Sequence, residues 1–207
     1  MNEVISNVVP PRSQRLKSAT HGTHDRLDKR IMAADIFADR EQFVGFLRVQ
    51  YRFHRDIAPL YDDPALAALI PELGERARLL RIANDLSSLG HVVPNLTQPP
   101  AAADLSLYQA LGWLYVAEGS NLGGTVLFKL ARERLGLNQQ LGANHLAAHP
   151  EGAARHWRQF TAALDAVPMN AAQEQDVITG AERAFTTVRG YVEQELPQVG
   201  DVQFARQ

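Results

Sequence analysis

Residues 119–124, Gly-Ser-Asn-Leu-Gly-Gly, constrain the fold of this chain most, because they place three glycines inside a pattern typical of one long helix. Apolar residues recur at helical spacing over residues 107–115 and again over residues 126–131. Glycine costs about 1 kcal/mol relative to alanine inside a helix, so the three together cost on the order of 3 kcal/mol. Three arrangements would explain them: a helix packed against the bare backbone, a flat ligand lying on it, or a loop that divides the segment into two helices.

The composition is that of an ordinary globular protein. The chain has 207 residues, 45% of them hydrophobic and 21% charged, which suits one domain with a buried core. A formal net charge of −2 gives no bias toward nucleic acid or a membrane surface. The absence of cysteine excludes disulfides, thiolate metal sites and cysteine nucleophiles, and it fits a reducing cytoplasm.

Two further absences in the sequence bear on location. No apolar run approaches the ~20 residues of a membrane span. The N-terminus lacks the basic flank and apolar core of a signal peptide. We therefore expect a cytoplasmic protein that binds neither nucleic acid nor membrane.

Helical patterns separated by Gly and Pro cover most of the sequence. We expect a first helix over residues 12–33 and a second over residues 40–60, capped by Asp39. Pro64 is expected to open a short turn of helix, and Pro71 another helix that continues to residue 86. Residues 90–103 contain three prolines and predict an ordered connector.

The second half of the chain follows the same pattern. Asp104 is expected to cap the glycine-containing helix, a further helix is expected over residues 151–164, and Asn170 is expected to cap a last helix that Pro197 ends. No strand alternation or internal repeat is visible. We predict an all-α, single-domain multi-helix bundle over residues 12–197, with a leader at residues 1–11 and a tail at residues 198–207.

His24 falls on the apolar stripe of the first helix, between Thr20 and Leu27. A polar side chain buried there without a partner costs roughly 1–3 kcal/mol, so it is either a hydrogen-bonded core residue or a ligand. A metal site of His21 and His24 with Asp28 is compatible with the spacing. However, no glutamate has a histidine three residues later, as di-iron helical bundles require, so that class is disfavoured.

Other polar residues allow two interpretations each. Gln50 and His54 share one face of the second helix. They either belong to a functional site or form part of a solvated polar stripe with Arg55 and Asp56. Arg78 is either a site residue or a surface charge in the run 75–78. His145, His149 and His156 are expected at the surface.

Nucleophile and nucleotide motifs are absent from the sequence. There is no Gly-x-Ser-x-Gly elbow, no Walker A loop and no Gly-x-Gly-x-x-Gly after a strand. Ser120 follows Gly119 within a helical pattern and not at a strand–helix turn, so it is a poor candidate nucleophile.

Two segments of the chain resemble the heme oxygenase family, in the branch found in Gram-negative bacteria. Residues 16–24 read Leu-Lys-Ser-Ala-Thr-His-Gly-Thr-His and are similar to the family's Leu-Lys-x-x-Thr-x-x-x-His segment, whose last histidine is the proximal iron ligand. Residues 112–123 resemble the family's distal helix. Further similarity at residues 142–146 and 156–160 extends the resemblance over about residues 12–195.

The resemblance implies that heme lies between a proximal helix and a kinked, Gly-rich distal helix. His24 would bind the iron, and the glycines would let the distal helix approach the flat heme. The resemblance further assigns a distal water network and the heme contacts. The distal catalytic residues are Gln50, His54, Arg78, Gly119, Ser120, Asn121 and Gly123. The heme contacts are His24, Lys17, Tyr115, Phe185 and again Gly119 and Gly123. By the same resemblance, Lys17 and Tyr115 hold the propionates, which implies α-meso cleavage.

The implied reaction converts heme to biliverdin, CO and Fe²⁺ with O2 and external electrons. No flavin or nicotinamide motif is present, so a ferredoxin, with its reductase, or a flavoprotein would supply electrons. Lys17, Lys129, Arg132 and Arg158 are candidates to dock an acidic donor, or else plain surface charges. The reaction would either release iron for acquisition or supply biliverdin to a bacterial phytochrome, and a monomer is expected. The alternatives are a heme carrier or sensor that does not degrade its ligand, and a TenA-like hydrolase on the same fold.

Overall fold

Helices account for nearly all of the regular structure in residues 9–196, which are the residues that the computed structural model describes. This part of the chain contains no β-strand, and no helix in it is long and apolar enough to cross a membrane. The helices are α1 (Arg12–Ala33), α2 (Arg40–Tyr61), α3 (Pro64–Ala67), η1 (Leu73–Arg76), α4 (Leu79–Ser88), α5 (Leu107–Leu135), η2 (Asn144–Leu146), α6 (Ala153–Ala166) and α7 (Ala171–Glu195). The predicted tail and residues 1–8 of the predicted leader lie outside the described residues.

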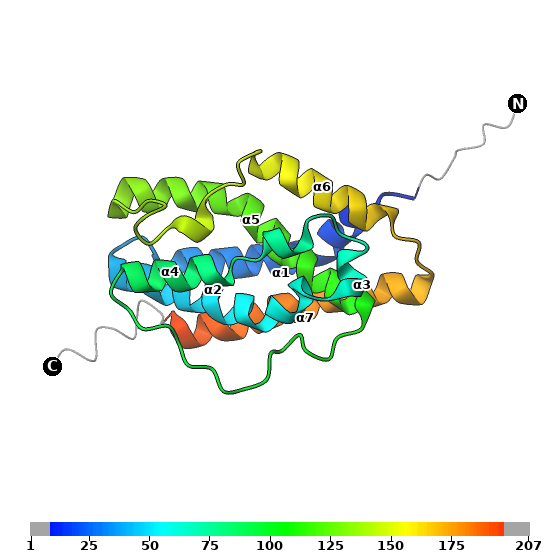
Figure 1. Ribbon diagram of the computed structural model, residues 1–207, viewed down its shortest axis with the longest axis horizontal. Helices are drawn as coiled ribbons and strands as arrows, with labels where there is room; N and C mark the ends of the chain where they lie inside the picture. Colours follow the sequence, from blue (N-terminus) through cyan, green and yellow to red (C-terminus); the bar gives the residue numbers. More distant parts are fainter. Residues whose placement is uncertain (1–8, 197–207) are drawn as a thin grey trace, which may run out of the picture.

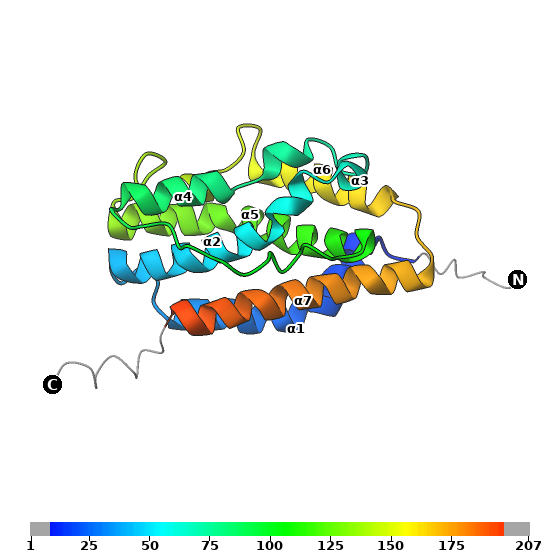
Figure 2. The same cartoon turned by 60° about the horizontal axis from the view of Figure 1, so that its bottom comes forward.

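The helices form layers, with α1 and α7 side by side along one face and α4 and α6 toward the opposite face (Figure 2). Between them run α2 and α5, and α5 packs against both α7 and α6 (Figures 1 and 2). The apolar stripes of these helices meet in one core, in which Leu16, Phe43, Trp113 and Phe160 are almost fully buried.

Glycine permits the close crossing of α5 and α7. A β-carbon at Gly112 would lie 2.1 Å from the carbonyl oxygen of Val177, and one at Gly180 would lie 2.2 Å from that of Gln109. No real β-carbon approaches a backbone atom so closely, so both positions require glycine. The predicted packing of a helix on bare backbone is therefore found in this protein, but at Gly112 and not in the 119–124 segment.

The glycine-rich segment lies inside one continuous helix, α5, so the alternative of two helices joined by a loop is wrong. Figure 1 shows α5 changing direction near its middle. The Ser120 hydroxyl donates to the carbonyl oxygen of Ala117 at 2.7 Å, a bond from a side chain back to the preceding turn that is typical of bent helices. The predicted distal helix is thus present as a single element.

The N-terminal signals of three helices were predicted correctly. α1 begins at Arg12, the Asp39 side chain caps α2 by accepting from the Gln42 amide, and Asn170 caps α7 in a reciprocal capping box with Gln173. The assignment of Asp104 was wrong, because Ser106 caps α5 by accepting from the backbone N–H of Gln109.

Two other boundaries also differ from the prediction. The helix expected from Pro71 to residue 86 is broken, because Ala77 is extended (φ −61°, ψ 133°) between η1 and α4. The helix expected from Glu151 begins only at Ala153, after Gly152 with φ 93°. The break at Ala77 matters for the site, since it turns the side chain of Arg78 toward the interior of the bundle.

Candidate functional site

A cavity of about 700 Å³ lies between α1, α2, α5 and α7, closed on one side by η2 and Trp157. Its volume is in the range of small-molecule and cofactor sites. Every site residue predicted from the sequence lines it: Lys17, His24, Gln50, His54, Arg78, Tyr115, Gly119, Ser120, Asn121, Gly123 and Phe185. Elements far apart in sequence therefore bring the whole predicted set to one place.

His24 stands on the α1 wall of this cavity. Its side chain is 55% exposed, although Thr20 and Leu27 on the same helix are buried, so it is not a core histidine. The ring meets Phe185 of α7 edge-on, with 5.9 Å between centroids. Nδ1 of His24 lies 3.3 Å from an Asp28 carboxylate oxygen, and a proton held there leaves the Nε2 lone pair available for a metal ion.

Amino-acid ligands alone do not form a metal site around His24. Among residues 9–196, no three His, Cys, Asp or Glu side chains gather closely enough to hold an ion. A metal bound by His24 would therefore have to bring further ligands of its own, as a metal inside a macrocycle does.

The glycines of α5 face the cavity with little protein against them. A β-carbon at Gly123 would have no atom of another residue within 4 Å. A β-carbon at Gly119 would meet only the ring of Trp157, at the ordinary contact distance of 3.7 Å. Helix packing therefore does not require glycine at either position, in contrast to Gly112.

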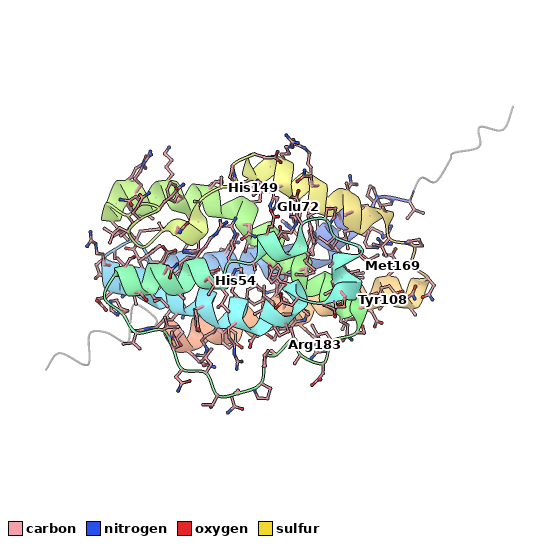
Figure 3. The ribbon with its side chains drawn as sticks, viewed as in Figure 1. His54, Glu72, Tyr108, His149, Met169 and Arg183 are labelled. Atoms are coloured by element: carbon pink, nitrogen blue, oxygen red, sulfur yellow. The ribbon has the colours of Figure 1, made fainter. Side chains whose placement is uncertain are left out.

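His54 and Arg78 line the same cavity and are 2% and 7% exposed. The interpretations of His54 as part of a solvated stripe and of Arg78 as a surface charge are both wrong, and Figure 3 places His54 in the middle of the bundle. Burial first, and then the nearby Arg78 and His145, lower the pKa of His54 to about 3. His54 is therefore neutral near pH 7, while Gln50 and Asn121 contribute half-buried amides to the same cavity.

His145 belongs to this wall as well, although the sequence led us to expect it at the surface. It is 3% exposed, and its Nδ1 lies 2.8 Å from a carboxylate oxygen of the equally buried Asp85. Arg78 donates to the carbonyl oxygens of His145 and Ala147, which fixes the η2 segment over the cavity. The segment 142–146 has no periodic pattern, so only its likeness to the family offered a signal for this residue.

A buried charge cluster includes Glu118, the residue before the cavity-lining Gly119, and was also missed. Arg76 and Glu118 form an ion pair at 2.8 Å. His156 lies 3.8 Å from the same Glu118 oxygen, and its ring stacks on His149 at 4.4 Å with the planes 2° apart. The predicted surface position is wrong for His156, which is 6% exposed, whereas His149 is half-buried toward the side that carries α6 (Figure 3).

Ionisation in this cluster follows from its burial. Burial raises the pKa of the Glu118 carboxyl, against the opposing effect of Arg76. Burial and then the Arg76 guanidinium lower the pKa of His156 to about 4. The histidine is thus neutral near pH 7 beside a charged pair that anchors α5 immediately before Gly119.

Lys17 and Tyr115 stand at another part of the cavity wall. Lys17 is exposed, whereas Tyr115 is 8% exposed and packs with Trp157 at 5.4 Å between ring centroids. Burial, followed by the nearby Asp165, raises the pKa of Tyr115, so its phenol stays protonated and can donate a hydrogen bond. An ammonium and a phenol together suit a carboxylate ligand.

Comparison with known proteins agrees with this geometry. The heme oxygenase family model matches residues 11–194. Heme oxygenase PigA of Pseudomonas aeruginosa is 45% identical over 174 residues, which cover 84% of this chain and 87% of the relative. The heme oxygenase of Xanthomonas campestris pv. campestris is 34% identical over 146 residues, which cover 68% and 84%. The chain belongs to the heme oxygenase family.

Solved structures of heme oxygenases share its fold. The heme oxygenase of Neisseria meningitidis, solved with NO and CO bound, superposes with a TM-score of 0.86 at 34% identity, covering 93% of this chain and 96% of the other. The heme oxygenase of Leptospira interrogans gives a TM-score of 0.71 at 17% identity, covering 89% and 100%, and this likeness concerns the fold alone. The predicted all-α heme oxygenase fold is confirmed.

As a heme oxygenase, the protein is an enzyme that degrades heme, with biliverdin and iron among the products of the family's reaction. The family assignment takes the place of the carrier, sensor and TenA-like alternatives. The roles of individual residues in this heme oxygenase remain predictions, because the comparisons identify the family and not its ligands in this chain.

Proposed function

We propose that heme binds as substrate in the cavity between α1 and α5, with its iron facing His24, and is opened at the α-meso carbon. The main support for this proposal is the free space at two glycines: a β-carbon at Gly123 would meet no atom within 4 Å, and one at Gly119 would meet only Trp157. Two helix-destabilising residues persist there without a packing requirement, so a flat ligand is the remaining explanation for them. Bound heme would supply the iron centre at which O2 is activated.

On the proximal side, we infer that Asp28 orients His24. A turn of the ring that let Nδ1 donate to the Asp28 carboxylate oxygen, now 3.3 Å away, would select the tautomer whose Nε2 binds iron, and it would raise the basicity of the ligand. The exposed position of His24 on the cavity wall supports this role, because its side chain is not enclosed by the core.

On the distal side, Gln50, His54, Arg78 and Asn121 would order water next to the bound oxygen. The carboxylates among the described cavity residues, Asp25 and Asp28, both come from α1, so α2, α5 and η2 present none. Ser120 uses its hydroxyl hydrogen within α5, toward Ala117. A network of neutral groups and one guanidinium favours hydrogen bonding through water over direct protonation by a strong acid.

Heme orientation would depend on Lys17 and Tyr115, which line the same cavity and match the two propionates in charge and hydrogen bonding. Phe185 would add an apolar contact beside His24. Lys17 and Tyr115 would thereby fix how the heme is seated, and the likeness of these residues to the family pattern supports the α isomer.

Electrons would come from an external donor such as a ferredoxin with its reductase, or a flavoprotein, and O2 would be the second substrate. Lys17, Lys129, Arg132 and Arg158 are all exposed and suit an acidic donor. We propose a cytoplasmic monomer whose reaction serves either iron acquisition, through the released iron, or the supply of biliverdin to a bacterial phytochrome.

A visible spectrum of the purified protein with one equivalent of hemin tests the function directly. We expect a Soret band on binding, and its loss with growth of biliverdin absorption when ascorbate or a ferredoxin reductase system is added in air. Chromatography of the product then identifies the isomer. A Soret band that survives reduction and oxygen, or no Soret shift at all, would contradict the proposal.

A further inference from the structure

His145 connects two parts of the structure, since it lines the cavity and also contacts Asp85 of α4. Both side chains are 3% exposed. The side chain of Asp85 accepts from the backbone N–H groups of Asn144 and His145, each at 2.8 Å, and lies 2.8 Å from the ring nitrogen Nδ1 of His145. The carboxylate therefore fixes the backbone of η2 and one edge of the imidazole together.

These contacts specify where the imidazole carries its hydrogen. A carboxylate that accepts from two backbone N–H groups acts as an acceptor toward Nδ1 also, so Nδ1 must donate. Burial lowers the pKa of His145, against the raising effect of Asp85, so the ring holds a single hydrogen near pH 7. With that hydrogen on Nδ1, the other nitrogen, Nε2, presents a lone pair.

Nε2 of His145 is buried and has no hydrogen-bond partner among the described residues. Arg78 contacts the carbonyl oxygen of His145, and Phe46 contributes a ring whose centroid is 6.3 Å away, so neither pairs with Nε2. A buried acceptor without a partner is unfavourable. Because His145 lines the cavity, a small movement of the cavity wall that admits a water to Nε2 would satisfy it.

We propose that His145 is a further positioning residue of the distal site, an acceptor whose tautomer Asp85 holds and which orients a water molecule beside the bound heme. This inference rests on the proposed distal water network. Arg78 only donates hydrogen bonds, while the amides of Gln50 and Asn121 can donate or accept. A fixed acceptor gives the network a direction: a water that donates one hydrogen to Nε2 of His145 keeps the other for the heme side.

The tautomer can be measured in the heme-free protein. Long-range ¹H–¹⁵N correlation spectra of ¹⁵N-labelled protein at neutral pH distinguish ring nitrogens with and without hydrogen, and the His145→Gln spectrum assigns the signal. We expect a hydrogen on Nδ1 and a bare Nε2. A hydrogen on Nε2, alone or in an imidazolium, overturns the proposal.

The effect on the heme side can be measured without turnover. The C–O stretching band of the CO complex reports polarity beside the ligand, so His145→Leu should shift it. His149→Leu changes a histidine four residues later that does not line the cavity, and it should not shift the band. An unshifted band in His145→Leu overturns the proposal. If the His145→Leu variant does not take up heme, the ¹H–¹⁵N spectrum of the unaltered, heme-free protein decides: a bare Nε2 supports the proposal, and a hydrogen on Nε2 overturns it. Failure of the unaltered protein to bind hemin would contradict the proposed function, and the tautomer result would still stand.

Discussion

Arg76 and Glu118 approach to 2.8 Å with side chains that are 0% and 1% exposed, and this pair joins η1 to α5 immediately before Gly119. Nε of Arg76 also donates to the carbonyl oxygen of Pro71 at 3.1 Å. The ion pair therefore anchors α5 just before Gly119, whereas Gly119 and Gly123 present no side chain to the cavity.

Breaking this pair on one side should destabilise the fold severely. Removing one partner of a buried ion pair leaves an uncompensated charge, which typically costs about 3–5 kcal/mol. We expect Arg76→Met to lower the free energy of unfolding by that order, measured by urea unfolding. The double variant Arg76→Met/Glu118→Leu should recover much of the loss. If its loss equals the sum of the losses in Arg76→Met and Glu118→Leu measured separately, this account is contradicted.

The protein should also lose stability in acid because of His54. Its pKa falls from the ordinary 6.5 to about 3 on folding, so between these values the unfolded chain binds a proton that the folded protein refuses. Above pH 6.5 the ring is neutral in both states and its titration does not affect stability. As the pH falls from 6.5 toward 3, the free energy of unfolding declines by about 1.4 kcal/mol per pH unit. His156, with a pKa of about 4, adds a similar decline.

Urea unfolding between pH 8 and pH 4 measures this dependence. His54→Gln removes the titrating group, so its free energy of unfolding should fall less steeply over this range than that of the unaltered protein. Identical slopes would mean that other groups account for the acid sensitivity.

Alanine at two glycines of α5 should have opposite effects. Gly112→Ala places a β-carbon 2.1 Å from the carbonyl oxygen of Val177, so we expect destabilisation of about 1–3 kcal/mol or more. Gly123→Ala meets no atom within 4 Å and should stabilise the heme-free protein by about 0.5–1 kcal/mol through helix propensity.

Hemin titration separates the two roles of glycine further. If heme lies on Gly123, the added methyl group should weaken hemin binding even though the heme-free fold gains stability. Gly190→Ala, on α7 and also without an atom within 4 Å, is the matched control and should leave hemin affinity unchanged. Equal affinity in Gly123→Ala would remove this glycine from the heme contact.

The helices could be predicted because their signals are local. The caps at Asp39 and Asn170 and the apolar stripe of α1 depend on residues within one or two turns of each other. The break at Ala77 was missed because the sequence around it is compatible with a helix, whereas the extended backbone is accompanied by contacts that Arg76 and Arg78 make with residues far along the chain.

The site could be predicted only as far as its residues resemble a family pattern. His24 and the α5 glycines belong to such a pattern, and they line one cavity. The partners Asp85 and His145 are 60 positions apart and carry no periodic or motif signal, so burial of this pair is a property of the folded chain. The same reasoning applies to Arg76 and Glu118.

His24→Ala should remove the axial histidine from bound heme. If Nε2 of His24 binds iron, the Fe–His band in the resonance Raman spectrum of the ferrous heme complex should disappear. His21→Ala is the matched control, because His21 lines the same cavity three residues earlier and should leave the band intact. A band that survives in His24→Ala would reject His24 as the ligand.

Replacing both propionate contacts should reduce the selectivity of ring opening. Lys17→Ala with Tyr115→Phe removes an ammonium and a phenol hydrogen bond from the cavity wall, so the heme should seat in more than one rotation and yield mixed biliverdin isomers. Lys29→Ala with Tyr108→Phe deletes the same groups outside the cavity and should leave the isomer ratio unchanged. Chromatography of the products gives the ratio directly. A purely α product from the Lys17/Tyr115 variant would mean that packing against Trp157 and Phe185, and not the propionate contacts, orients the heme.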